Sequence, residues 1–188
     1  MKNLLTVISL LITLSVKSQS TDFVSFVNKG ISSFSVDSFN LSFEKKINEY
    51  RKEIGAKNTI YDKSLVKIAQ DQSDYCILKK KFTHYQSENP SKNSPWDRGE
   101  FFGYVNDSNE VFSENLLSGN ISSSMSIHYK KGINFYDLLS IYLIESWKKS
   151  ESHNSSMISP ANCKFAVSIS VKDDLVIACL FIITMIPE

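Results

Sequence analysis

The sequence is poor in the residues that mark several classes of protein. Its 188 residues include six Gly and four Pro, which excludes collagen-like and Pro/Gly-rich low-complexity architectures. Three Cys are too few, and odd in number, for a disulfide scaffold. The 21 basic and 20 acidic residues nearly cancel, so the chain lacks the positive charge that binds nucleic acid through phosphates. A length of 188 residues predicts one folded domain, large enough to bury a single substantial core.

The N-terminus has the layout of a secretory signal peptide. Lys2 precedes an apolar run from Leu4 to Leu14, and small or β-branched residues follow up to Ser18, where a signal peptidase would cut. A short anchoring helix is the alternative, but the run is shorter than the ~20 residues that span a bilayer. We therefore expect a secreted, extracytoplasmic chain. Loss of Lys2 and Lys17 leaves 19 basic and 20 acidic residues.

The remainder is expected to form one unit behind a short leader. Residues 1–18 are the expected signal peptide, 19–39 an irregular Ser- and Phe-rich lead-in that packs on the domain, and 40–188 the domain itself. No later segment is a convincing transmembrane span, because the apolar run of Leu175 to Ile186 is too short. We expect a monomer.

Hydrophobic spacing predicts three main helices. Phe43 to Ile54 carries apolar residues at i, i+4, i+7 and i+11. Asp62 is the expected N-cap of a second helix, whose stripe runs from Leu65 to Cys76. Residues 86–110 read as a polar surface excursion with a short helix near Trp96–Phe102. The spacing of Tyr136, Leu139, Leu143 and Trp147 predicts the third helix.

The C-terminal part changes to the period of a β-hairpin. From Cys163 to Val171, apolar residues alternate with Lys, Ala, Ser and Ser, Lys172–Asp174 forms the turn, and Leu175 to Ile186 is almost wholly apolar. A strand covered on both faces requires helices on both sides. The predicted fold class is therefore α/β, a three-layer α-β-α sandwich around a central antiparallel sheet.

The hairpin also constrains the cysteines. A two-residue loop pairs Cys163 with Ile183 or Thr184 and Cys179 with Ser168, so the two thiols lie on opposite faces. A disulfide between them is not expected, because bridged Cα atoms lie within ~7 Å. Pairing of Cys76 stays open, with buried free thiols the preferred interpretation.

Three local clusters could carry chemistry, at residues 82–84, 96–115 and 147–153. None is specific alone, but their order resembles bacterial members of the CAP superfamily, the SCP domain of cysteine-rich secretory proteins, antigen 5 and pathogenesis-related proteins. The resemblance spans roughly residues 40–188. It rests on Ile47-Asn48-Glu49-Tyr50-Arg51, Leu65, Ala69, His84, Arg98 with Gly103-Tyr104, Glu114-Asn115, and Trp147-x-x-Ser150-x-x-His153.

The resemblance implies an α–β–α sandwich whose central cavity is lined by two His and two acidic residues, which hold a divalent metal in some members. By position, His84, Glu114 and His153 are the implied ligands of Zn²⁺ or another divalent metal. The implied cavity residues are His84, Glu114, Asn115, Ser150, Glu151 and His153. The position of the second acidic residue is occupied by Ser150, so the set of four is incomplete. A hydrogen-bonded polar cluster that orders the cavity is the alternative to a metal site.

Two classes of function fit these residues. The first is a secreted, non-enzymatic binding module for a small apolar molecule, a peptide or a protein surface. A variant of it is a surface interaction protein whose cavity has only a structural role. The second is a secreted, protease-like hydrolase using Ser150 or Ser152 as nucleophile, His153 as base and Glu114 or Glu151 as orienter. No Gly-x-Ser-x-Gly turn surrounds either serine, which favours the binding module.

Overall fold

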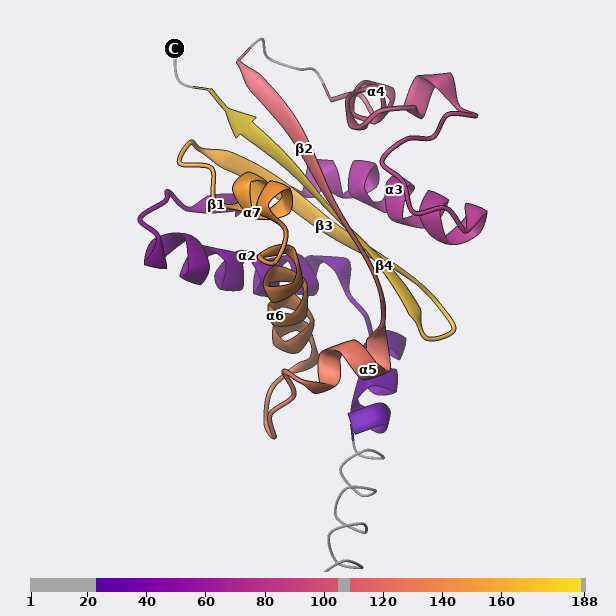
Figure 1. Cartoon of the computed structure of the whole chain (residues 1–188), viewed down its shortest axis with the longest axis vertical. Helices are drawn as coiled ribbons and strands as arrows, with labels where there is room; N and C mark the ends of the chain where they lie inside the picture. Colours follow the sequence, from indigo (N-terminus) through magenta and orange to yellow (C-terminus); the bar gives the residue numbers. More distant parts are fainter. Residues whose placement is uncertain (1–22, 105–108, 187–188) are drawn as a thin grey trace, which may run out of the picture.

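The computed structural model describes residues 23–104 and 109–186 (Figure 1). The expected signal peptide at 1–18 lies outside the described residues. In chain order the elements are a helix over residues 23–32, α2 (Val36–Glu53), β1 (Thr59–Tyr61), the 3₁₀ turn η1 (Lys63–Leu65), α3 (Val66–Lys79), η2 (Pro90–Lys92), α4 (Pro95–Phe101), β2 (Glu110–Asn120), α5 (Ile121–Ser126), α6 (Phe135–Trp147), α7 (Glu151–Met157), β3 (Cys163–Lys172) and β4 (Leu175–Met185).

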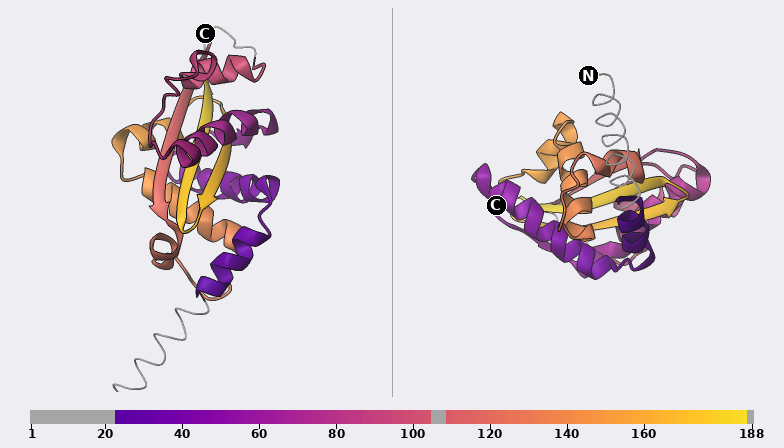
Figure 2. Two further views of the ribbon diagram at one scale, coloured as in Figure 1. Left: turned by 90° about the vertical axis from the view of Figure 1, so that its right-hand side faces the viewer. Right: turned by 90° about the horizontal axis from the view of Figure 1, so that it is seen from below.

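Four strands form the central sheet in the order β1-β3-β4-β2. The strands β3, β4 and β2 are antiparallel, as predicted, whereas the short edge strand β1 runs parallel to β3, so the sheet is mixed. Helices enclose the sheet (Figure 2). Side chains of α2 and α6 pack on one face and those of α3 on the other, which gives two separate core clusters. The predicted α-β-α sandwich is confirmed.

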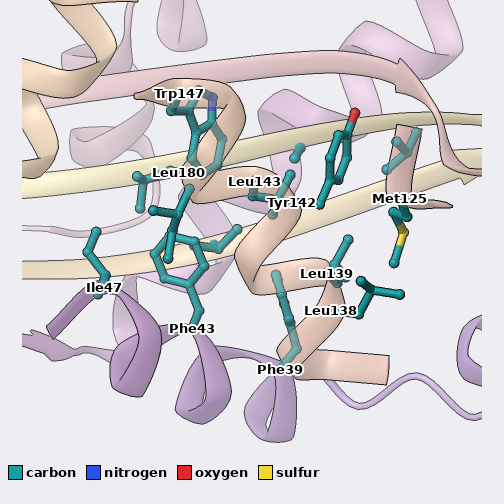
Figure 3. Packing of buried hydrophobic residues seen from close by; sticks show 14 of the residues in the cluster. Phe39, Phe43, Ile47, Met125, Leu138, Leu139, Tyr142, Leu143, Trp147 and Leu180 are labelled. Carbon is teal, nitrogen blue, oxygen red and sulfur yellow. The ribbon is translucent and has the colours of Figure 1, made fainter. Parts of the chain in front are cut away.

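The larger core cluster lies between α2, α6 and the sheet (Figure 3). Phe43 of α2 packs edge-on against Trp147 of α6, with ring centroids 6.1 Å apart. Trp147 is fully buried, as its position on an apolar stripe predicts, and its Nε1 donates to the main-chain oxygen of Leu116 at 3.2 Å. This bond attaches the end of α6 to β2, directly before the chain enters α7.

The described part of the lead-in over 19–39 forms a helix over residues 23–32 and the start of α2 from Val36, so the irregular segment predicted there is wrong. Phe23 and Val27 are spaced by one helical turn and are both buried in the core cluster. Ser35 then caps α2, because its side chain accepts from the Ser38 N–H. The predicted packing of this segment on the domain is confirmed.

The hairpin has the predicted register. Cys163 lies opposite Thr184 and Cys179 opposite Ser168, and the two cysteines belong to different core clusters on opposite faces. All three cysteines are buried and free in the structure. Asp62 is an N-cap as predicted, although it caps η1, which leads into α3.

Across the described residues, no helix combines the length and hydrophobicity that crossing a bilayer requires.

Candidate functional site

Glu114 of β2 is the buried centre of the site. Its side chain is 1% exposed, and both carboxylate oxygens have partners. Oε1 lies 2.8 Å from Nδ1 of His84, while Oε2 pairs with the Arg98 guanidinium and accepts from the Cys179 thiol at 3.6 Å. Because an ionised carboxylate only accepts, the first contact assigns the hydrogen of His84 to Nδ1. Arg98 supplies the opposite charge that burial of a carboxylate requires.

Arg98 also fixes the loop that carries His84. It lies on α4, which begins at a capping box between Ser94 and Asp97. The side chain is fully buried, and its Nη1 donates to the main-chain oxygens of His84 at 3.2 Å, Lys92 at 3.2 Å and Asn93 at 3.4 Å. Sequence reasoning used Arg98 only to support the family resemblance and missed this role. The only sequence signal is its position within a short capped helix between His84 and Glu114.

The helix α7 approaches the opposite face of β2 and brings His153 to the site. The Asn115 amide donates to the main-chain oxygen of His153 at 2.9 Å, and the Ser156 hydroxyl donates to Asn115 Oδ1 at 2.8 Å. From the other side, Tyr50 of α2 donates to Asn154 Oδ1 at 2.9 Å. Since Asn115 is buried, these bonds hold α7 firmly against the strand.

A cavity of about 560 Å³ lies next to β2, and its lining includes the His84–Glu114 pair and residues of α7. The structure brings four predicted residues to its wall, namely His84, Glu114, Asn115 and His153. The remaining lining residues are Ser152, which sequence reasoning weighed as an alternative nucleophile, and six that it did not assign to the cavity, namely Val111, Ser113, Ser155, Ser156, Ser159 and Thr184. Burial, followed by repulsion from His84, lowers the pKa of His153 below its usual 6.5, so the imidazole is neutral at pH 7.

The other two predicted cavity residues lie elsewhere. Ser150 is the N-cap residue of α7 and Glu151 its first residue, and neither lines the cavity. The Ser150 hydroxyl lies 3.2 Å from the Ser152 hydroxyl. Among the described residues, no serine hydroxyl forms a hydrogen bond with the imidazole of His84 or His153. The structure thus separates Ser150 from the cavity that His153 and Glu114 line.

The site can offer a divalent metal fewer protein ligands than the family resemblance implies. Both oxygens of Glu114 are already bonded, one of them to a cation, so this carboxylate is not a free third ligand. It instead bonds Nδ1 of His84, which is how a carboxylate orients a metal-binding imidazole from outside the ligand set. The two imidazoles on the cavity wall are the remaining nitrogen donors.

The fold has counterparts in known proteins. The sequence model of the cysteine-rich secretory protein family, CAP, matches residues 45–182. The chain belongs to this family.

Solved structures with the same fold come from bacteria. An outer surface protein from Borrelia burgdorferi is 16% identical, with a TM-score of 0.56 over 81% of this chain and 96% of that one. An extracellular protein containing an SCP domain from Bacillus anthracis is 14% identical, with a TM-score of 0.52 over 77% of this chain and 40% of that one. No curated protein matches the sequence.

Proposed function

We propose that this CAP domain is an extracytoplasmic, non-catalytic binding module whose cavity receives a polar segment of a peptide or protein. The observation that carries the proposal is the state of Glu114. Its carboxylate is buried and bonded on both oxygens, so it supports the cavity wall and does not act on a ligand. The names of two solved structures of this fold, an outer surface protein and an extracellular protein, support export.

The lining of the cavity favours a polar ligand over an apolar small molecule. Besides the two imidazoles, the wall consists mainly of serine and threonine hydroxyls and the Asn115 amide, with Val111 as the apolar exception. The hydroxyls offer hydrogen bonds that an apolar ligand would leave unmade, at a cost of about 1–3 kcal/mol for each group that becomes desolvated without a partner. A peptide main chain supplies both donors and acceptors.

Panning a phage-displayed random peptide library on the immobilised protein tests the binding function. The variant Ser155→Trp places an indole at the cavity wall, where Ser155 is exposed. The matched control Ser32→Trp adds the same group to an exposed position on the helix over residues 23–32. We expect enriched peptides to bind the wild type and Ser32→Trp, with at least ~10-fold weaker binding to Ser155→Trp. Equal binding to all three proteins, or no enrichment, would contradict the proposal.

Digestion of a quenched fluorescent peptide library tests the hydrolase alternative. We expect no cleavage above a mock-purified sample, because Ser150 lies outside the cavity and the Ser152 hydroxyl on its wall pairs with Ser150 and not with an imidazole. Cleavage that is lost in His153→Ala and in either Ser150→Ala or Ser152→Ala would show that the site is catalytic.

Zinc binding is a second proposal, favoured by the two imidazoles that line the same cavity and by the lowering of the His153 pKa by His84. His84 and His153 would be the ligands, with Glu114 orienting His84. With two protein ligands, affinity should lie well below that of a three- or four-ligand site. Zn²⁺ titration of the wild type beside His84→Ala/His153→Ala tests this, and identical heats in the two proteins would remove the metal site.

A further inference from the structure

The outer edge of β2 is open next to the cavity, and the direction of its main-chain groups follows from three hydrogen bonds. In an antiparallel strand, the N–H and C=O of one residue point to the same side, and successive residues alternate. Two odd-numbered residues at the ends of β2 face β4. The Asn109 oxygen accepts from the Ile186 N–H at 2.7 Å, and the Ile121 N–H donates to the Asp174 oxygen at 3.0 Å. Leu116 is even-numbered, and its oxygen faces away from β4, toward Trp147.

The pairing of β2 with β4 is continuous from Glu110 to Asn120, so this alternation runs through the whole strand. Phe112 and Glu114 therefore direct their N–H and C=O groups away from β4. No described residue bonds these outward groups, and in the part of the chain that the structure covers β2 ends the sheet. The Glu114 side chain is 1% exposed although the residue as a whole is half-buried, so its exposed surface belongs to the main chain.

The open edge has two different walls. Both α4 and α7 contact β2 (Figure 1). On the α4 side, the half-exposed Trp96 packs against Phe112 with tilted rings, whose centroids are 4.9 Å apart. On the α7 side, the cavity offers Ser152, Ser155 and the His153 imidazole. The open part of the β2 edge ends at Leu116, because its outward oxygen already accepts from the Trp147 indole.

We infer that the edge of β2 at Phe112 and Glu114 binds an extended peptide segment of a partner protein as an added strand. The unpaired N–H and C=O groups on the edge match those of a peptide main chain. Side chains alternate along a strand, so the bound segment places an apolar residue beside Trp96 and a small polar residue toward the α7 serines. This inference rests on the proposed function and specifies its ligand as an extended peptide of alternating character.

Amide hydrogen exchange of the ¹⁵N-labelled protein, followed by NMR, tests the edge without any substitution. In the free protein we expect the amides of Phe112 and Glu114 to exchange at least ~10-fold faster than those of Ser113 and Asn115, which face β4. With a saturating peptide from the library selection, the amides of Phe112 and Glu114 should slow by at least ~10-fold, while that of Ser113 stays unchanged. Two versions of the peptide, N-methylated at the even-numbered or at the odd-numbered amides, test the pairing. Methylation of the amides that face β2 should abolish binding, and methylation of the other set should preserve it.

Failure of the added strand and failure of the proposed function are distinguishable. Slow exchange of Phe112 and Glu114 in the free, monomeric protein would show that the edge is covered. Protection that appears with rising protein concentration alone, together with a doubled mass in solution, would assign the edge to a second copy of this chain. A peptide that binds without protecting these two amides would overturn the added strand and leave the proposed function standing. If no peptide binds, both fail.

Discussion

Replacement of Arg98 by Met should destabilise the protein far more than loss of a surface ion pair does. Arg98 and the Glu114 side chain are 0% and 1% exposed, so the substitution leaves an ionised carboxylate buried without a counter-charge. Breaking a buried pair from one side costs about 3–5 kcal/mol. The carbonyl oxygens of His84, Lys92 and Asn93 lose the same donor. At roughly 2–4 °C per kcal/mol for a chain of this size, the melting temperature should fall by about 6–20 °C.

Urea denaturation of five proteins measures this effect: the wild type, Arg98→Met, Glu114→Gln, the double variant and a control. The control is Lys63→Met, which breaks an ion pair with Asp37 whose side chains are 75% and 49% exposed, and it should cost at most ~1 kcal/mol. The double variant Arg98→Met/Glu114→Gln removes both charges and should be more stable than the sum of the single losses by at least ~1 kcal/mol. An Arg98→Met loss no larger than the control loss would refute the assignment of Arg98 as the buried counter-charge.

Three further predictions follow from buried groups. Arg51 is buried and donates to the main-chain oxygens of Lys57, Met157 and Ser159, so Arg51→Leu should lower the free energy of unfolding by at least ~3 kcal/mol and loosen the end of α7; urea titration and amide exchange of residues 151–157 measure both. The folded state lowers the pKa of His153 below 6.5, so as the pH falls the imidazole becomes protonated in the unfolded state before it does in the folded state. The free energy of unfolding should therefore fall as the pH drops below 6.5 and stay level above it. His153→Gln should remove this component in metal-free urea titrations at pH 5.5 and 7.5, and an unchanged slope would contradict it. The three buried cysteines should resist alkylation in the native protein and react fully in urea; mass spectrometry counts the labels, and rapid native labelling would contradict their burial.

Sequence periodicity predicted the long helices and the hairpin because their cores are strongly apolar. The helix α2 buries one repeated face with Phe43 and Ile47, and the β3–β4 pair buries both faces, so tertiary packing agrees with the local pattern. The strand β2 was not predicted because its site residues interrupt this pattern. Glu114 and Asn115 are polar residues at inward positions, and each is stabilised by partners distant in sequence. The short strand β1 has no period of its own.

Motif spacing predicted part of the site and misplaced the rest. His84, Glu114 and His153 reach one cavity because the topology of the sandwich brings α4 and α7 to the same strand. Ser150 was expected beside His153 from its spacing along a helix. The structure starts α7 at Glu151, so Ser150 is its cap and lies outside the cavity wall. The role of Arg98 depends on burial against Glu114, which no local pattern reveals.

The most direct test of the central claim is the fate of a selected peptide in the cavity. The peptide is incubated with the wild type, Ser155→Trp and His153→Ala, and both the bound fraction and the peptide mass are measured by size-exclusion chromatography and mass spectrometry. A non-catalytic binding module predicts that the wild type retains an intact peptide and that Ser155→Trp releases it. Cleavage by the wild type that disappears in His153→Ala would contradict the account.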